Sequence, residues 1–144
     1  GSYPIELAKF APSVQVHQHA CPMWVPLIEN QQYAHPAGQQ FIAEDTNALM
    51  NSHPEIDTIL LACTHYPVLK NQIEALVGPA VQVVAQGPIV ADKLKDYLLA
   101  HPEMASRLTK TGTTSYITSE TTAVFNEKAS YFLGEQIKAE HHSF

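Results

Sequence analysis

The segment DTILLACTHYPVL, residues 57–69, decides the fold of this chain. Its first part, DTILLAC, is an unbroken apolar run, which is typical of a central parallel strand covered on both faces. Pro67 can begin a helix because the first turn of a helix needs no N–H at that position. Apolar residues then recur at helical spacing until Gly78, a residue type that often ends helices. The segment therefore predicts a strand, a tight turn and a helix.

The flanking sequence continues this alternation. Residues 41–52 carry apolar side chains on one helical face, and Pro4 can begin a short helix through Phe10. Downstream, residues 81–86 predict a strand, and residues 113–119 predict another before a helix that ends at Gly134. Between them, Pro88 begins a helix whose core-facing residues are expected to be Ile89, Val90, Leu94, Tyr97 and Leu98. The sequence thus predicts an α/β fold, a parallel sheet flanked by helices.

Other segments give weaker signals. The alternation of Val14 and Val16 predicts a short strand that ends near Cys21. The two prolines in CPMWVPLIEN, residues 21–30, indicate an irregular loop, and polar residues 30–39 indicate surface. The tail QIKAEHHSF is expected to be frayed.

The domain organisation follows from one long connection. Residues 99–112 are long for a loop within a compact α/β unit and are interpreted as a linker. We therefore predict a domain over residues 1–98 and a strand-helix segment over residues 113–144 that completes another domain. The start at Gly1 without methionine indicates an expression remnant or a cut inside a longer protein.

The composition indicates a globular protein that binds a small molecule. The 144 residues are 45% hydrophobic and 15% charged, which suffices for a buried core. A net charge of −6 with 8 Lys and Arg argues against nucleic acid and anionic membranes as partners. Without a signal pattern or a long apolar run, the expected location is the cytoplasm.

Cys63 is the first candidate for chemistry, because ligands of open α/β sheets bind beyond the carboxyl ends of strands. A thiol exchanges protons readily beside a helix N-terminus and an imidazole, and the sequence supplies Pro67 and His65. Thr64 adds a hydroxyl suited to a carboxylate or amino group of a ligand. A lone cysteine after an apolar strand is usually core, but a structural site has no need of the polar Thr64 and His65. We predict that Cys63 is a working thiol.

Glu29 and Cys21 are further candidates. Glu29 follows the proline-rich stretch CPMWVPLI, which can hold its carboxylate in place to orient an imidazole. Taken alone, a glutamate is more often a solvated surface charge. Cys21 is interpreted as a packed free thiol.

The sequence predicts no metal and no cofactor. His17 and His19 lie at strand spacing, His141 and His142 lie in the tail, and no cysteine pair has a zinc spacing. No glycine-rich phosphate loop is present, so no nucleotide is implied.

Several blocks of the chain resemble the glutamate racemases, within the aspartate and glutamate racemase superfamily. ACTHYP resembles the second-cysteine motif of this family. The blocks GSYPIELAKFAP, ACPMWVPLIEN, DTILLACTHYPVL and VVAQGPIVADKLKDYL resemble consecutive parts of the family's second half, and the resemblance extends to about Leu133. The chain departs from the family at Ala62, where glycine is usual, and at residues 86–88, where many members carry an Asp-Ser type sequence.

The resemblance implies a cofactor-independent enzyme that interconverts L- and D-glutamate for peptidoglycan synthesis. Two cysteines flank the substrate, and one removes the α-proton while the other returns a proton to the opposite face. By motif match, Cys63 is the second of these thiols. Thr64 and His65 match residues that contact the substrate, and His65 also assists its cysteine. Glu29 matches the acidic residue that supports this half of the site.

The family's first cysteine and its N-terminal Asp-Ser motif have no counterpart here, and Cys21 does not match that cysteine. The chain is therefore expected to be a partial copy of a two-domain racemase whose partner is the missing N-terminal half. It is expected to be inactive alone, because one thiol cannot serve both faces of Cα. A homodimer is a further possible assembly. The alternatives to a glutamate racemase are an aspartate-type racemase, a Cys-His hydrolase and a non-catalytic folding or interaction module.

Overall fold

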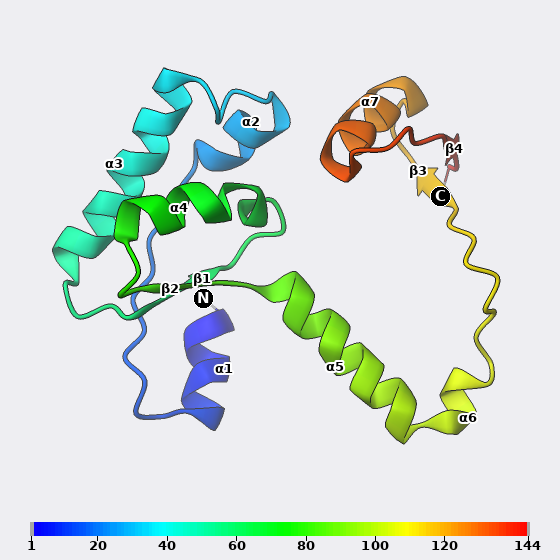
Figure 1. Cartoon of the computed structure of the whole chain (residues 1–144), viewed down its shortest axis with the longest axis horizontal. Helices are drawn as coiled ribbons and strands as arrows, with labels where there is room; N and C mark the ends of the chain where they lie inside the picture. Colours follow the sequence, from blue (N-terminus) through cyan, green and yellow to red (C-terminus); the bar gives the residue numbers. More distant parts are fainter. Residues whose placement is uncertain (1, 144) are drawn as a thin grey trace. The chain divides into compact units, whose positions relative to one another are not determined.

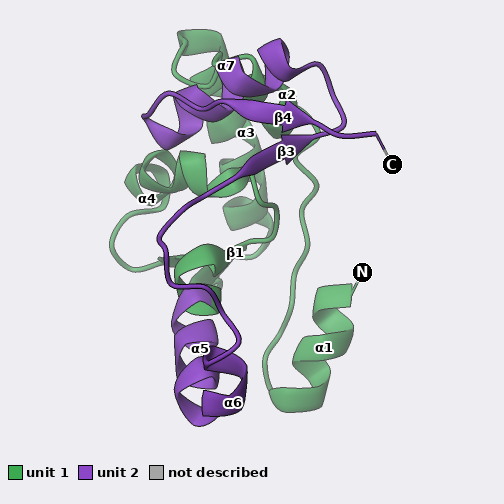
Figure 2. Cartoon of the chain, turned by 90° about the vertical axis from the view of Figure 1, so that its right-hand side faces the viewer, with its two compact units in different colours: residues 1–90 green, residues 91–144 purple. Residues whose placement is uncertain are grey.

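The computed structural model describes residues 2–143 and divides the chain into two compact units (Figures 1 and 2). One unit ends at Val90 and the other begins at Ala91. Each unit contains one pair of parallel strands with helices beside it. The predicted α/β class, with parallel strands flanked by helices, is therefore confirmed.

The first unit is built around a strand-helix-strand element. Its elements are α1 (Ser2–Phe10), α2 (Trp24–Glu29), α3 (Pro36–Ser52), β1 (Thr58–Leu61), the 3-10 helix η1 (Tyr66–Leu69), α4 (Lys70–Val77), β2 (Gln82–Ala85) and the start of α5 (Gln86–Ala100). Strands β1 and β2 run parallel, with Thr58 opposite Gln82 and Leu61 opposite Ala85. Gly78 ends α4 with a φ of 77°, a conformation that glycine adopts without strain.

The core of the first unit lies on one face of this strand pair. Helices α3 and α4 pack against each other and lie on the same side of β1 and β2 (Figure 1). The buried cluster comprises Trp24, Ile28, Ile42, Leu61, Leu69, Ile73 and Val83. Each such aliphatic side chain stabilises the fold by roughly 1.5–3 kcal/mol. Because α2 and η1 both contribute to this cluster, the segments on either side of the predicted site are anchored.

Two expectations for the N-terminal part are wrong. Residues 13–20 form no strand, and CPMWVPLIEN contains the helix α2 in place of an irregular loop. Pro26 is the third residue of α2, within the first turn, where the N–H groups have no partner inside the helix. A proline there does not oppose the helix, so its usual meaning as a helix breaker misled the prediction.

Residues 30–39 are also not all surface. Helix α3 begins at Pro36, five residues before the predicted start, and Gly38 is buried. A Cβ at Gly38 would lie 2.1 Å from the carbonyl oxygen of Gln32. Only glycine therefore allows the preceding turn to lie so close to the helix.

Two expectations about burial and one about the start of a helix need correction. Strand β1 is not covered on both faces, since Leu61 is 3% exposed but Leu60 is 37% exposed. The apolar side chains of α5 do not form core, and Leu94 is 56% exposed. The helix expected from Pro67 begins as the short 3-10 helix η1, so regular α-helix begins only at Lys70.

The second unit continues from α5 with α6 (Pro102–Ala105), β3 (Tyr116–Thr118), α7 (Thr122–Leu133) and β4 (Ala139–His141). The predicted frayed tail is wrong, because β4 pairs in parallel with β3. Ile137 is buried, and its N–H donates to the hydroxyl oxygen of Ser130 at 2.8 Å. The N–H of Ala139 donates to Oδ1 of Asn126 at the same distance, 2.8 Å. Side chains of α7 thus hold the tail in place.

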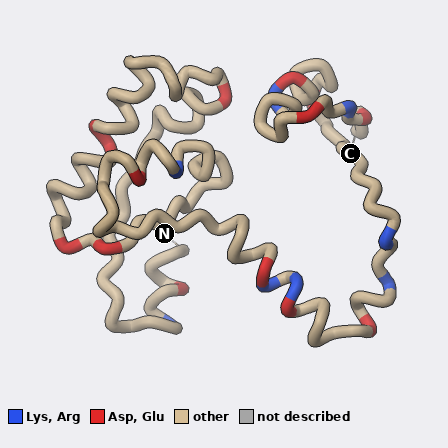
Figure 3. The backbone as a smooth tube through the Cα atoms, viewed as in Figure 1, with Lys and Arg blue, Asp and Glu red and all other residues tan. Residues whose placement is uncertain are grey.

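The charges are spread over both units. Figure 3 shows acidic and basic positions on both units, and the whole sequence has 14 acidic residues against 8 basic ones. Among residues 2–143, no helix combines the length and the apolar character needed to cross a membrane.

Candidate active site

Cys63 lies two residues after β1, in the turn that leads to η1. The N–H of Tyr66 donates to the carbonyl oxygen of Cys63 at 3.2 Å and closes this turn. The thiol is half-buried, so it is neither sealed in the core nor fully in solvent. This is the position that the sequence predicts for a working thiol, at the carboxyl end of a strand.

The side chains of Cys63, His65 and Glu29 form a chain of contacts. Nδ1 of His65 lies 3.9 Å from Sγ of Cys63, and Nε2 of His65 lies 3.2 Å from Oε1 of Glu29. A carboxylate that accepts the Nε2 proton leaves Nδ1 as an acceptor for the thiol proton. The arrangement can therefore move a proton between the thiol and the imidazole.

The fold brings this group together from distant parts of the sequence. Glu29 is the last residue of α2, whereas His65 immediately precedes η1. The two elements are joined through the core, where Ile28 and Leu69 are fully buried. The three residues that the sequence nominates as catalytic thus lie together, and their side chains remain accessible, with His65 35% and Glu29 38% exposed.

Thr64 lies between Cys63 and His65 and is exposed. Its hydroxyl is available to a ligand that approaches the turn. The η1 helix follows this turn but has only four residues, so the amides near Cys63 belong to a 3-10 turn and not to the N-terminus of a long helix. The imidazole is therefore the better defined neighbour of the thiol.

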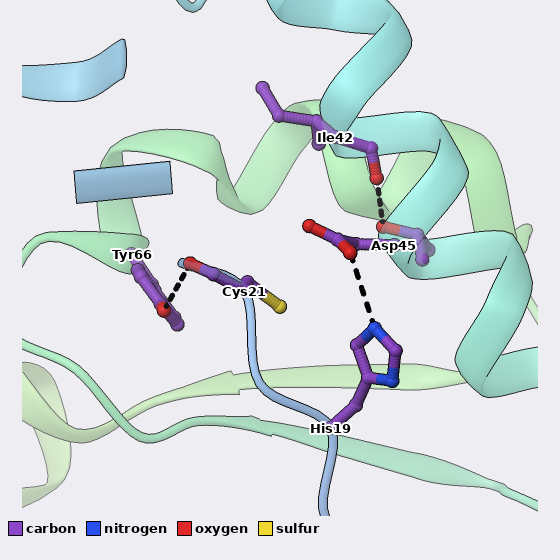
Figure 4. A network of polar contacts seen from close by, with 6 residues as sticks. His19, Cys21, Ile42, Asp45 and Tyr66 are labelled. Atoms are coloured by element: carbon purple, nitrogen blue, oxygen red, sulfur yellow. Dashed lines mark hydrogen bonds and ion pairs between the residues drawn. The ribbon is translucent and has the colours of Figure 1, made fainter. Parts of the chain in front are cut away.

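Tyr66 is a residue that sequence reasoning missed. Its hydroxyl donates to the backbone oxygen of Cys21 at 3.2 Å (Figure 4), and its ring packs edge-on against Trp24 with centroids 4.9 Å apart. Burial raises the pKa of Tyr66 to about 12, with Cys21, Cys63 and Asp45 as further electrostatic causes. Tyr66 therefore stays a hydrogen-bond donor at neutral pH. Its partner lies 45 residues earlier in the chain, which no local pattern can reveal.

Two hollows lie away from these residues. One, of about 730 Å³, is lined by residues of α4 and β2 such as Glu74 and Val83. The other, of about 500 Å³, lies between α7 and the segment before β4 and includes Asn126 and Ile137. Neither hollow is lined by Cys63, so neither is the predicted glutamate site.

The chain is similar in sequence to known racemases, although no protein-family model matches it. Glutamate racemase of Chlorobaculum parvum is 32% identical over 125 residues, which cover 87% of this chain and 45% of that protein. Glutamate racemase 2 of Caldanaerobacter subterraneus is 32% identical over 140 residues, covering 94% of this chain and 50% of that protein. The chain belongs to the glutamate racemase family.

Solved racemase structures agree with this relationship. Glutamate racemase isoform RacE1 from Bacillus anthracis matches 99% of this chain with a TM-score of 0.83 and 25% identity, over 52% of that chain. The glutamate racemase of Francisella tularensis, solved in complex with D-glutamate, has the same fold with a TM-score of 0.76 at 18% identity. The chain spans about half the length of the curated racemases it matches.

Proposed function

We propose that the chain forms the C-terminal half of a cofactor-independent glutamate racemase, in which Cys63 acts on one face of the substrate's Cα. The observation that supports this most directly is the position of His65, 3.9 Å from the thiol and 3.2 Å from Glu29. A thiol that must gain and lose protons in every cycle needs a neighbouring group that can exchange them. His65, oriented by Glu29, is that group.

The chemistry of the proposal is a pair of proton transfers. The thiolate of Cys63 removes the α-proton from one face, which leaves a carbanion and a neutral thiol. A second thiol, on the missing half, delivers its proton to the opposite face and inverts Cα. In the reverse direction the two thiols exchange roles, and His65 resets the protonation of Cys63 between turnovers. Thr64 is proposed to bind the substrate from the exposed side of the turn.

The missing half is the proposed partner. One thiol can serve only one face of Cα, so the isolated chain is proposed to be inactive. The exposed apolar side chains support an absent partner, since Leu60 on β1 and Leu94 on α5 are 37% and 56% exposed. We also propose that residues 113–144 complete a domain of the full enzyme, which acts in the cytoplasm.

A Cys-His hydrolase is the second candidate, and one observation favours it. Cysteine hydrolases also use a thiol that contacts an imidazole, which in turn contacts a carboxylate or another orienting group. The two reactions differ in what happens to the substrate. Racemisation places solvent deuterium at Cα, whereas hydrolysis forms a thioester on Cys63 that mass spectrometry can trap.

The test joins this chain to the N-terminal half of the B. anthracis relative, in the order of the natural enzymes. Racemisation of L- and D-glutamate in D2O is followed by optical rotation and by deuterium at Cα. We expect turnover by the fusion, none by the 144-residue chain alone, and a loss of at least about 100-fold with Cys63→Ser. Substantial turnover by the isolated chain would contradict the proposal that this chain carries only half of the active site. A fusion that keeps its activity with Cys63→Ser would contradict the role of Cys63. Aspartate tested in parallel decides the substrate preference.

A further inference from the structure

A second group of ionisable side chains lies between the irregular segment before α2 and the helix α3. Nε2 of His19 lies 3.2 Å from Oδ1 of Asp45, and the donor atoms of His19, Cys21 and Asp45 all lie within 4.8 Å of one another. Figure 4 shows the three side chains turned toward the same space. None of them belongs to the Cys63 site, and the proposed racemase reaction does not use them.

We propose that His19, Cys21 and Asp45 bind a divalent transition-metal ion of the zinc class. Imidazole nitrogen, thiolate sulfur and carboxylate oxygen are the ligand types that zinc takes in proteins. With bond lengths of about 2.0–2.3 Å, the ligand atoms of a tetrahedral site lie roughly 3.3–3.8 Å apart. The separations between the three atoms, none above 4.8 Å, therefore exceed those of a tetrahedral site by at most about 1.5 Å, and water can take the fourth position.

The backbone holds two of the three ligands in place. Cys21 is fixed by its carbonyl oxygen, which accepts the Tyr66 hydroxyl at 3.2 Å and the Trp24 N–H at 3.2 Å. Asp45 lies in the middle of α3, which contributes the fully buried Ile42 to the core. His19 lies two residues before Cys21 on an irregular segment. A small movement of His19 is sufficient to close the site.

Metal binding at this cluster requires the thiolate form of Cys21. Binding of a divalent ion therefore releases the thiol proton.

A neighbouring cluster of His17, His53 and Glu55 is a less suitable site. The two imidazole rings are stacked, with centroids 3.5 Å apart and planes at 24°, so their in-plane lone pairs run nearly parallel and do not converge. Glu55 is also 57% exposed. This cluster has two histidines and a carboxylate but no thiol, which makes it the matched control.

The proposed ion would fasten a weakly held segment. Within the described part of the chain, no backbone N–H from residues 15–23 donates to a backbone carbonyl. A metal bound by His19 and Cys21 on this segment and by Asp45 on α3 strengthens the attachment that the His19–Asp45 contact already makes. It also adds a side-chain attachment to Cys21, whose carbonyl oxygen accepts the Tyr66 hydroxyl.

Titration with Co²⁺ tests the proposal on the 144-residue chain, because cobalt reports a bound thiolate by a charge-transfer band. The band is expected with the parent and with Cys63→Ser, and Zn²⁺ should displace it. Cys21→Ser is expected to abolish the band, and His19→Gln or Asp45→Asn to weaken binding at least about tenfold. His17→Gln and His53→Gln should leave the affinity unchanged.

Three results would overturn the site: no band with the parent, a band that survives Cys21→Ser, or a band that disappears with Cys63→Ser. Circular dichroism establishes that each variant is folded. If Cys21→Ser fails to fold, His19→Gln decides, because its side chain is 32% exposed and its loss leaves the core intact. An unchanged affinity in a folded His19→Gln variant contradicts the proposal.

Discussion

Glu29, at the end of α2, lies 3.2 Å from Nε2 of His65, which immediately precedes η1. This contact fixes which ring nitrogen of His65 faces the thiol of Cys63. Because the carboxylate accepts the Nε2 proton, Nδ1 is left to exchange a proton with sulfur. Both partners are more than one-third exposed, so the contact orients the ring and adds little to stability.

We predict that Glu29→Gln slows the alkylation of Cys63, because the amide no longer stabilises the imidazolium that pairs with a thiolate. The expected effect is about tenfold, and His65→Gln should have a larger one. Iodoacetamide labelling at neutral pH, followed by peptide mass spectrometry, measures the rate. His101→Gln is the matched control, since His101 makes a similar contact with Glu103 at 3.0 Å outside the site. Equal rates for all variants would remove His65 and Glu29 from the mechanism.

The two thiols are expected to differ in reactivity. The pKa of Cys21 is raised from 9.0 to about 12, which lowers its thiolate fraction near pH 8 about a thousandfold. Cys63 should therefore be labelled first in the folded chain, and Cys21 only after unfolding in urea. Labelling of Cys21 at the rate of a free thiol would contradict its burial.

Alkaline pH is expected to destabilise the first unit. Burial raises the folded-state pKa of Cys21 from 9.0 and that of Tyr66 from 10.0, each to about 12. The unfolded chain therefore loses these protons at lower pH than the folded chain does. Their contribution to stability is complete below pH 9 and is lost as the pH rises toward about 12. Urea unfolding at neutral and alkaline pH measures this loss.

Urea unfolding of variants separates the contribution of Cys21 from that of Tyr66. Tyr66→Phe and Cys21→Ser should each flatten the alkaline part of the profile. Tyr97→Phe, at an exposed tyrosine of α5, is the control and should leave the profile as in the parent. An identical alkaline loss in all three variants would show that neither buried group causes it.

Gly38→Ala is expected to destabilise the chain by about 1–3 kcal/mol. The new Cβ would lie 2.1 Å from the carbonyl oxygen of Gln32, and this backbone atom cannot move without shifting the turn before α3. Gly87→Ala is the control, because a Cβ at Gly87 meets nothing within 4 Å and alanine favours the helix α5. Thermal unfolding compares the two, and equal melting temperatures would mean that the turn adapts freely.

Much of the fold can be predicted from local patterns. The apolar run before Cys63, Pro67 and Gly78 predict β1, a turn and a helix because each signal acts within a few residues. The helix α2 was missed because Pro26 is unfavourable in most of a helix but neutral in its first turn. The strand β4 was missed because three residues carry little periodicity, and its pairing with β3 depends on α7.

The candidate site was only partly predictable. Cys63, Thr64 and His65 are adjacent in sequence, so their chemistry can be read together. The contact of His65 with Glu29 comes from tertiary packing, as does the bond from Tyr66 to Cys21. Leu60 and the apolar side chains of α5 are more exposed than the sequence predicts. An apolar pattern indicates that a surface is suited to burial but does not show which part of the protein covers it. This chain spans about half the length of its relatives.

The connection β1–α4–β2 also has a consequence for the order of folding. Its strands pair across only 24 residues, between Thr58 and Gln82, so little chain entropy opposes its formation. The hydroxyl of Tyr3 in α1, by contrast, accepts the side-chain amide of Gln86 across 83 residues. We expect the strand-helix-strand element to form early and α1 to dock late. During synthesis, α1 would thus stay undocked until the ribosome has released Gln86.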